Sequence, residues 1–224
     1  MAKRIMGVFS DSTKLSFLND FVEQPAEAVG AAVAAGWQDG TSPDGLIYAP
    51  HFLTEGEAEQ LVAEIDARPW QDDLKRRVQH YGFRYDYKER NINRDLSRTT
   101  PLPERAEALA RRISEHLTRL GHRFQFTQMI VNEYLPGQGI SAHIDHPAFR
   151  GPVVSVSLLS AVVMDFEGPE KQKYGRLLEP GSMVALTGPA RETWTHAIKA
   201  RKSDTIEGKK CPRGRRVSLT YRVF

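Results

Sequence analysis

Three residues of this chain have the types and the spacing of a metal site. His143 and Asp145 are separated by one residue in the segment ISAHIDHP. On an extended strand, residues two apart point to the same face, so both side chains could bind one ion. A third ligand should come from a distant strand, and His196 in ETWTHAI is the best candidate. Two histidines and one carboxylate occupy one face of an octahedral iron and leave three positions open for a bidentate co-substrate and dioxygen.

A second set of residues could hold a small dianion near such an ion. Arg216 and Arg222 fall on one face of the C-terminal run RVSLTYR, and arginine grips carboxylates bidentately. Their spacing spans ~20 Å of strand, so only inward-leaning side chains could converge on one dicarboxylate. Asn132 and Tyr134 in VNEYLPG repeat the two-residue spacing and offer hydrogen-bond donors. Each piece alone has a simpler explanation, such as a surface histidine beside a solvated aspartate, or two exposed arginines on an edge strand.

Two helices are expected ahead of the residues that could do chemistry. Thr54 and Glu57 have the spacing of a capping box, which predicts a helix from about 55 to 66. A second helix is predicted from residues 101–103, PLP, to about residue 120. Its apolar face would contain Ala106, Leu109, Ala110, Ile113, Leu117 and Leu120.

The remainder of the chain has the pattern of short strands. From His122 onward, β-type runs are broken by glycine and proline: RFQFTQMIVNEYL, VVSVSLLSAVVMDF, SMVALTG and RRVSLTYRVF. The sequence therefore predicts an α+β fold, a β-sandwich or barrel with the N-terminal helices packed on one sheet. The loop-like stretch QDGTSPDG at 38–45 places the start of the core near Gly45. Residues 1–45 would form a partly helical or flexible extension, and residues 46–224 a single domain.

Composition indicates an ordinary globular protein with a basic body. The 224 residues are 40% hydrophobic and 26% charged, with a net charge of +3. Residues 1–66 carry 3 Lys+Arg against 11 Asp+Glu, which leaves 28 against 17 for residues 67–224. A basic body suits a polyanionic partner, although solvated surface charge is an equal alternative. One cysteine and no long apolar run predict a cytoplasmic protein without membrane insertion, and we expect a monomer.

Four segments together resemble the AlkB family in order, spacing and content over about residues 47–224. They are MIVNEYLPGQGISAHIDHP, RGPVVSVSLLSAVVMDF, GRLLEPGSMVALTGPARETWTHAI and RRVSLTYRVF. The resemblance implies a double-stranded β-helix, or jelly roll, and an oxidation of alkylated nucleobases that uses Fe(II), 2-oxoglutarate and O2.

The resemblance also implies roles for individual residues. Fe(II) would be bound by His143, Asp145 and His196. Arg216 would hold the distal carboxylate of 2-oxoglutarate, and the co-substrate pocket would be completed by Asn132, Tyr134 and Arg222.

Two departures from the bacterial repair enzyme of the family are visible. The resemblance places Ser218 in the co-substrate pocket, where that enzyme has asparagine, so one hydrogen bond to the co-substrate is expected to differ. In the loop that follows the HxD motif, His146, Pro147, Ala148 and Phe149 replace a longer acidic stretch that helps to hold the base. A shifted substrate choice is the expectation, with His146 in contact with the substrate.

The segment LKRRVQHYGFRYDY at 74–87 is similar to the animal AlkB homologue that modifies wobble uridine in tRNA. In the family this region forms the lid over the nucleotide. Arg76 and Arg77 would meet phosphates. The base would be stacked or enclosed by Tyr81, Phe83, Tyr85 and Tyr87. An exposed β-hairpin with aromatic cross-strand pairs is the structural alternative.

Four hypotheses about activity remain at this point. The first is an N-alkyl demethylase of DNA or RNA, of the alkylation-repair type. The second is a hydroxylase of a modified wobble uridine in tRNA, and the third a demethylase of protein lysine. The fourth is a nucleic-acid-binding jelly roll with an inert metal site, against which the five intact residues of the metal and arginine motifs argue. An enzyme of this kind acts on single-stranded or flipped bases.

Overall fold

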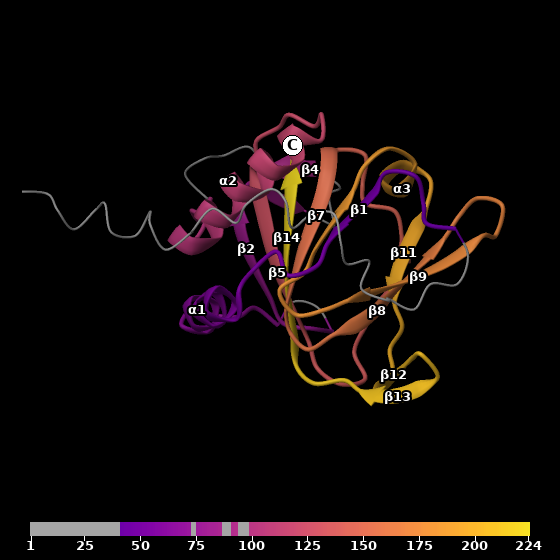
Figure 1. Ribbon diagram of the computed structural model, residues 1–224. Coiled ribbons are helices and arrows are strands. Elements are labelled where there is room, and N and C mark those ends of the chain that lie inside the picture. The colour runs from indigo at the N-terminus through magenta and orange to yellow at the C-terminus, as the bar shows by residue number, and fades with distance from the viewer. Residues whose placement is uncertain (1–40, 73–74, 87–90, 94–98) are drawn as a thin grey trace, which may run out of the picture. The chain divides into compact units, whose positions relative to one another are not determined.

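The chain folds around two antiparallel β-sheets that face each other (Figure 1). The computed structural model describes residues 41–72, 75–86, 91–93 and 99–224, with the backbone alone for 84–86 and 91–93. The larger sheet has the strand order β1 (Leu46–Ala49), β10 (Met183–Leu186), β7 (Arg150–Leu159), β14 (Arg216–Val223), β5 (Gln128–Tyr134) and β2 (Val78–Gly82). The smaller sheet has the order β6 (Ile140–His143), β11 (Thr195–Ile198), β8 (Val162–Glu167) and β9 (Lys173–Leu178). Two hairpins join β3 (Arg84–Asp86) to β4 (Asn91–Asn93), and β12 (Ser203–Ile206) to β13 (Lys209–Pro212).

From β5 onward the chain passes repeatedly between the two sheets, apart from the consecutive pair β8 and β9 and the separate hairpin of β12 and β13. β5, β7, β10 and β14 belong to the larger sheet, whereas β6, β8, β9 and β11 belong to the smaller one. This alternation wraps the chain around a central space, which is the arrangement of a jelly roll. The predicted double-stranded β-helix is therefore confirmed.

The two predicted helices cover the outer face of the larger sheet (Figure 1). Helix α1 (Glu55–Asp66) begins with the predicted capping box, in which Thr54 and Glu57 each bond the backbone N–H of the other. Helix α2 (Glu104–Arg119) buries the predicted face, apart from its last member. Leu120 is 51% exposed because it lies past the last helical residue, where the chain turns away from the sheet.

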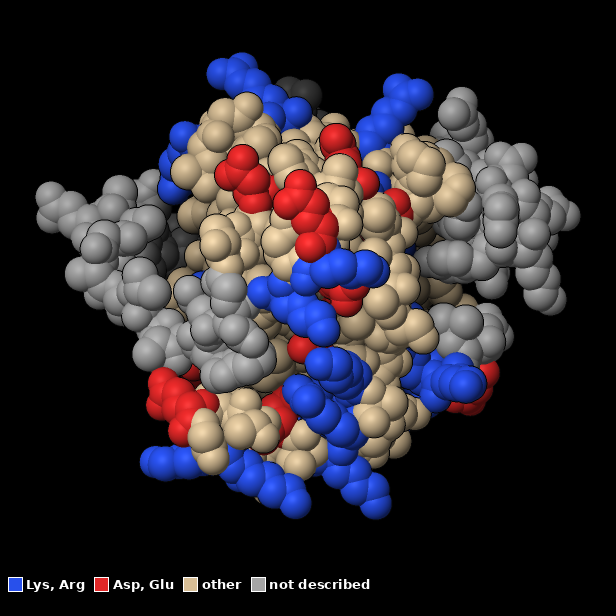
Figure 2. Space-filling model, turned by 90° about the vertical axis from the view of Figure 1, so that its right-hand side faces the viewer, with Lys and Arg blue, Asp and Glu red and all other residues tan. Residues whose placement is uncertain are grey.

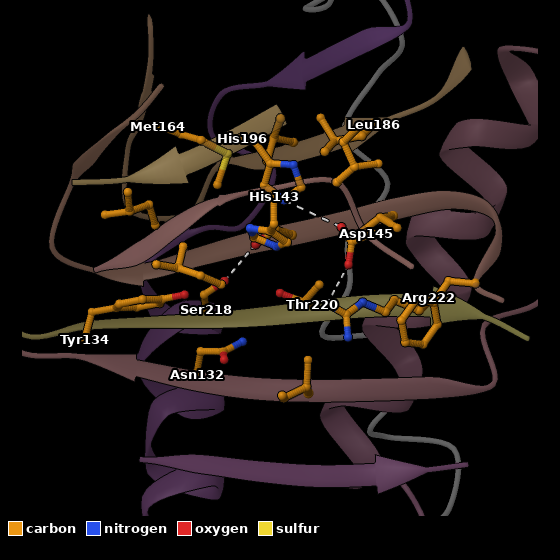
Figure 3. A pocket seen from close by; sticks show the side chains of 18 of the residues that line it. Asn132, Tyr134, His143, Asp145, Met164, Leu186, His196, Ser218, Thr220 and Arg222 are labelled. Carbon is orange, nitrogen blue, oxygen red and sulfur yellow. Dashed lines mark hydrogen bonds and ion pairs between the residues drawn. The ribbon is translucent and has the colours of Figure 1, made fainter. Parts of the chain in front are cut away.

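Strand β14 separates the helix-facing core from the space between the sheets. Val217, Leu219 and Tyr221 are fully buried in the core beneath the helices, and the hydroxyl of Tyr221 donates to the carbonyl oxygen of Ala106. Because side chains alternate along a strand, the residues between them must face the smaller sheet. Figure 3 shows this for Ser218, Thr220 and Arg222. The predicted alternation of this strand is therefore confirmed.

The first described strand, β1, is fixed at its start by Gly45. The backbone of Gly45 has a φ of +83°, and a Cβ there would lie 2.2 Å from the carbonyl oxygen of Thr187. Thr187 precedes the short helix α3 (Gly188–Glu192). The predicted domain boundary at residue 45 stays a prediction, because residues 1–40 lie outside the described part.

Among the described residues, no helix has the length and apolar character to span a bilayer. The smaller sheet presents its outer face on the side shown in Figure 2, where Lys and Arg side chains gather in the middle and lower part of the view.

Candidate active site

The two histidines of the predicted metal site lie directly opposite each other in the smaller sheet. His196 in β11 and His143 in β6 are register partners, and their ring centroids are 4.3 Å apart. Asp145 follows the end of β6, and its Oδ2 lies 3.6 Å from Nε2 of His196. One possible ligand atom from each of the three residues lies within 4.8 Å of the other two. Figure 3 shows the three side chains meeting between the sheets.

The protonation states of these residues suit a divalent cation. Burial raises the pKa of Asp145, but the neighbouring Arg222, His196 and His143 outweigh that effect and hold the pKa below its ordinary value. Burial lowers the pKa of His196 to about 4. At neutral pH the group therefore contains an ionised carboxylate and a neutral imidazole, which are the forms that bind metals.

A backbone contact orients the ring of His143. Its Nδ1 lies 2.9 Å from the carbonyl oxygen of Ser141. A carbonyl oxygen can only accept a hydrogen bond, so Nδ1 is the donor in this contact and Nε2 is the nitrogen left for a metal. A hydrogen bond of this kind fixes the tautomer of a metal-binding histidine.

Two arginines hold Asp145 from different sides. Nη2 of Arg222 lies 2.8 Å from Oδ1 of Asp145, a contact drawn in Figure 3. Arg191 in α3 is 7% exposed and donates to the carbonyl oxygens of Asp145, His146 and Phe149 at 2.9–3.0 Å. Since Asp145 lies beyond the last residue of β6, these contacts, rather than the strand, determine its position.

A cavity of about 680 Å³ opens between the sheets, and all three residues form part of its wall. Ile144 and His146 are exposed and lie in the wall on either side of Asp145, so the cavity is open to solvent at this point. Much of the remaining wall is apolar and includes Ile130, Met164, Val184, Leu186 and Ile198. Such a wall excludes water from the space beside the three polar side chains.

Arg216 is a buried cation in the same wall. It is 3% exposed, and its Nη2 donates to Oγ of Ser157 at 2.9 Å. Its Nε and Nη1 have no hydrogen-bond partner among the described residues. Burial lowers the pKa of the guanidinium to about 10, so it stays charged at neutral pH. A buried charge with free donors is costly unless an anion binds to it, and a carboxylate matches this geometry.

Three polar side chains lie next to Arg216, namely Asn132, Tyr134 and Arg76. β5 pairs with β14 so that Tyr134 is opposite Arg216. Nε of Arg76 donates to Oδ1 of Asn132 at 2.9 Å. The guanidinium carbons of Arg76 and Arg216 lie 5.5 Å and 5.3 Å from the centre of the Tyr134 ring. Oδ1 of Asn132 accepts the hydrogen bond from Arg76, so the amide NH2 of Asn132 remains available to the cavity.

The two C-terminal arginines lie in one cavity but do not converge. Arg222 contacts Asp145. Arg216, six residues earlier on β14, contacts Ser157 in β7. About 20 Å of strand separates the two residues, and Arg222 has a carboxylate partner in Asp145. Their guanidinium groups therefore do not meet at one point, and the co-substrate role of each stays a prediction.

Ser218 faces the cavity, but a neighbouring hydroxyl engages it. Its Oγ lies 2.7 Å from Oγ of Ser155 in β7. The serine therefore belongs to the wall, and its hydroxyl is shared within a pair.

The residues that were expected to contact substrate divide into separate groups. His146 and Arg76 line the cavity. Arg77 instead forms an ion pair with Glu133, 2.6 Å between Nε and Oε2. Tyr81 is 4% exposed and packs in the helix-facing core, with its hydroxyl donating to Gln79. Arg77 is exposed but paired with a carboxylate, and Tyr81 is buried away from the cavity wall, so their substrate roles stay predictions.

Neither of the two aromatic side chains of the predicted lid that the structure describes, Tyr81 and Phe83, forms part of the cavity wall. Phe83 packs edge-on against Phe224, with 6.3 Å between ring centroids, and Phe224 contacts the cavity residue Phe149 at 4.7 Å. The side chain of Tyr85 and all of Tyr87 lie outside the described residues.

Several residues that form or support the site were missed from the sequence. Ser155 and Ser157 alternate with buried valines in VVSVSLLS, and small polar residues at alternate positions of a buried strand could have indicated them. Arg191 gave no such signal, since it belongs to a five-residue helix that exhibits no periodicity.

A family model described as the 2OG-Fe(II) oxygenase superfamily matches residues 45–222. The chain is 36% identical over 177 residues to the tRNA (carboxymethyluridine(34)-5-O)-methyltransferase ALKBH8 of Macaca fascicularis, which covers 74% of this chain but 26% of that protein. It is also 36% identical over 200 residues to the "Alkylated DNA repair protein ALKBH8 homolog" of Arabidopsis thaliana, covering 80% of this chain and 58% of that protein. The chain thus spans about a quarter to somewhat more than half the length of these relatives.

The structure of OsALKBH1 is similar to this one, with a TM-score of 0.60 and 18% identity over 84% of this chain and 100% of that one. This likeness concerns the fold alone. The family uses Fe(II) and 2-oxoglutarate, and both fit the residues present: two imidazoles beside one ionised carboxylate, and a buried guanidinium with two donors that have no partner among the described residues. The chain belongs to the 2OG-Fe(II) oxygenase superfamily and is homologous to the AlkB proteins.

Proposed function

We propose that this protein is an Fe(II)- and 2-oxoglutarate-dependent dioxygenase that removes an N-alkyl group from a nucleobase of DNA or RNA. The observation that carries the proposal is the presence of two complementary sites in one cavity. One is the trio of His143, Asp145 and His196, and the other is the buried guanidinium of Arg216. A metal and a dicarboxylate would satisfy both.

The three converging side chains would hold the metal, and two further contacts would keep them in place. Fe(II), when bound with 2-oxoglutarate and O2, supplies the oxidation of a C–H bond, coupled to the decarboxylation of 2-oxoglutarate to succinate. His143 is oriented by Ser141, and Asp145 is held by Arg222. Ligands that are fixed before the metal arrives bind it more tightly, because less ordering is required on binding.

The far end of the cavity would receive the distal carboxylate of 2-oxoglutarate. Nε and Nη1 of Arg216 are the donors there that no described residue engages. The amide of Asn132 and the hydroxyl of Tyr134 would add neutral donors from the adjacent strand. The shared hydroxyl pair of Ser218 and Ser155 would contribute little to this contact.

A nucleic-acid substrate is supported by the relatives and by charge. The names of the two relatives above refer to tRNA and to alkylated DNA, and residues 67–224 carry an excess of Lys and Arg. A specific observation favours a second candidate, hydroxylation of a modified tRNA uridine, because the 36% identity to a uridine-34 enzyme covers 74% of this chain.

Mass spectrometry of nucleic acids after incubation with the protein, Fe(II), ascorbate and 2-oxoglutarate tests the proposal. Oligonucleotides that contain 1-methyladenine or 3-methylcytosine should lose one CH2 unit. A gain of one oxygen on a tRNA uridine would support the second candidate instead. If neither changes while 2-oxoglutarate is consumed, the nucleobase proposal is wrong.

Replacement of Arg191 by Met should weaken metal binding. Three backbone carbonyls around Asp145 would lose their common donor, and changes to such supporting contacts cost about 10- to 100-fold in metal affinity. Titration with Mn(II), without any turnover, measures the effect. Arg213→Met is the matched control: this equally buried arginine holds Asp204, away from the cavity, so the variant should lose stability but keep its Mn(II) affinity. Equal Mn(II) affinities in wild type and Arg191→Met would contradict the assigned role.

Replacement of Arg76 by Met should raise the KM for 2-oxoglutarate about five- to tenfold, as expected for one lost hydrogen bond. Without the contact from Arg76, the amide of Asn132 is free to turn its oxygen toward the co-substrate. Steady-state kinetics at varied 2-oxoglutarate, with RNA affinity measured in parallel, tests this. Weaker RNA binding with an unchanged KM would return Arg76 to the phosphate-binding role that the sequence indicated.

A further inference from the structure

We propose that residues 199–213, here named the basic hairpin, bind the phosphate backbone of a nucleic acid whose target base lies in the cavity. The segment contains β12, β13 and the residues that lead into them. The inference rests on the proposed function, since it presupposes a nucleic-acid substrate, and it adds a second contact region at a distance from the metal site.

The charge of the basic hairpin is strongly positive at its surface. The segment has six Lys and Arg and two acidic residues. One of these acids, Asp204, is 2% exposed and is paired with Arg213 at 2.6 Å and with Arg201. Glu207 is therefore the one acid of the segment that remains exposed.

Three lysines of the basic hairpin have no carboxylate partner within the described part of the chain. Lys202, Lys209 and Lys210 are exposed, and no ion pair found among the described residues includes them. Lys199 differs, because its Nζ lies 3.1 Å from Oδ1 of Asp165. Exposed lysines without partners can neutralise phosphates and release counter-ions without breaking an existing ion pair.

The basic hairpin is also well fixed before any ligand binds. Glu207 and Gly208 form its two-residue turn, with φ values of 50° and 76°, which match the tight turn that joins twisted strands. Asp204 accepts from the backbone N–H of Val163 in β8. Burial raises the pKa of Asp204, but the hydrogen bond from Arg213 helps to hold it below its ordinary value, so this anchor stays ionised. The lysines therefore project from a rigid support.

The position of the basic hairpin suits a long ligand. Figure 1 shows β12 and β13 at the lower end of the smaller sheet, and Figure 2 shows a band of Lys and Arg in the middle and lower part of that side. The hairpin joins the Arg216 end of β14, whereas Asp145 contacts Arg222 near the other end. These two ends are ~20 Å apart along the strand, several times the ~3.4 Å spacing of stacked nucleotides in one strand of a duplex.

Salt-dependent binding of RNA to a triple variant tests the inference. Lys202, Lys209 and Lys210 are replaced together by Gln, and affinity for a full-length tRNA is measured over a range of KCl concentrations. Each lost phosphate contact lowers the slope of log K against log salt by about 1, so a reduction of about 2 to 3 is expected. Affinity for a methylated trinucleotide should not change, since it is too short to reach the hairpin.

A second triple variant controls for net charge. Arg111, Arg119 and Arg123 are exposed and lie on or just after α2, which covers the other sheet. Their replacement by Gln removes the same charge and should leave the salt slope near that of the wild type.

Three outcomes would overturn the inference. An unchanged slope in the hairpin variant, with trinucleotide oxidation intact, would overturn the basic hairpin alone. Equal losses in both triple variants would assign the effect to net charge rather than to this surface. A wild-type protein that neither binds nor oxidises any nucleic acid would overturn the proposed function as well. Turnover of 2-oxoglutarate without substrate should be equal in all three proteins, which shows that the cavity is intact.

Discussion

Replacement of Asp145 by Asn is expected to reduce succinate formation to the level of metal-free protein. The amide has nearly the same shape as the carboxylate and keeps an oxygen for the contact with Arg222. It has lost the negative charge that a divalent cation requires from its single carboxylate ligand. Mn(II) affinity should fall in parallel, which separates a lost ligand from a lost reaction step.

Folding and a second aspartate provide the controls for this variant. Asp145 lies near the cations of Arg222 and Arg191, so part of its effect could come from destabilisation, and circular dichroism must show that the variant is folded. Asp165→Asn is the matched change, because Asp165 lies in β8, pairs with Lys199 and is outside the cavity wall. It should retain metal affinity and 2-oxoglutarate turnover. A folded Asp145→Asn protein with normal turnover would refute the assignment of Asp145 as a ligand.

Replacement of Arg216 by Met is expected to raise the concentration of 2-oxoglutarate needed for half-maximal turnover by about 10- to 100-fold. The change removes a charged, bidentate contact while filling similar volume, and hydrogen bonds to charged groups contribute about 1.5–3 kcal/mol each. Direct titration with 2-oxoglutarate in the presence of Mn(II) should give a similar loss. Mn(II) affinity alone should change little, because Arg216 contacts none of the three metal-site residues.

The neighbouring residue is a stringent control for Arg216. Arg215 points away from the cavity and pairs with Asp66 and Glu133. Arg215→Met should therefore lower stability without changing the requirement for 2-oxoglutarate. If the two variants alter that requirement equally, the effect of Arg216 is structural and the carboxylate assignment fails.

Local patterns predicted the elements of this fold well, because each depends on residues close in sequence. The capping box of Thr54 and Glu57 located α1, and alternation along β14 located the face that carries Arg216. The same alternation grouped His143 with Asp145, although the strand ends at His143 and Asp145 is held by arginines from other segments. The proximity was right, but its cause is tertiary.

The sequence could not predict which face of the edge strand β2 turns toward the cavity. Tyr81 was expected at the substrate, yet the register of β2 against β5 places it opposite Met129, on the side of the helices. Arg76, which precedes that strand, turns the other way and enters the cavity. Period-two alternation is unchanged by exchange of the two faces, so the pattern alone cannot separate these outcomes.

Turnover of 2-oxoglutarate to succinate by the purified protein is the most direct test of the central claim. The proposed site predicts that succinate forms with added Fe(II), stops when the metal is chelated, is absent in Asp145→Asn, and increases when a methylated nucleic acid is supplied. Succinate formation that is indifferent to Fe(II) or to the Asp145 change would contradict the claim that His143, Asp145 and His196 hold the metal beside the co-substrate.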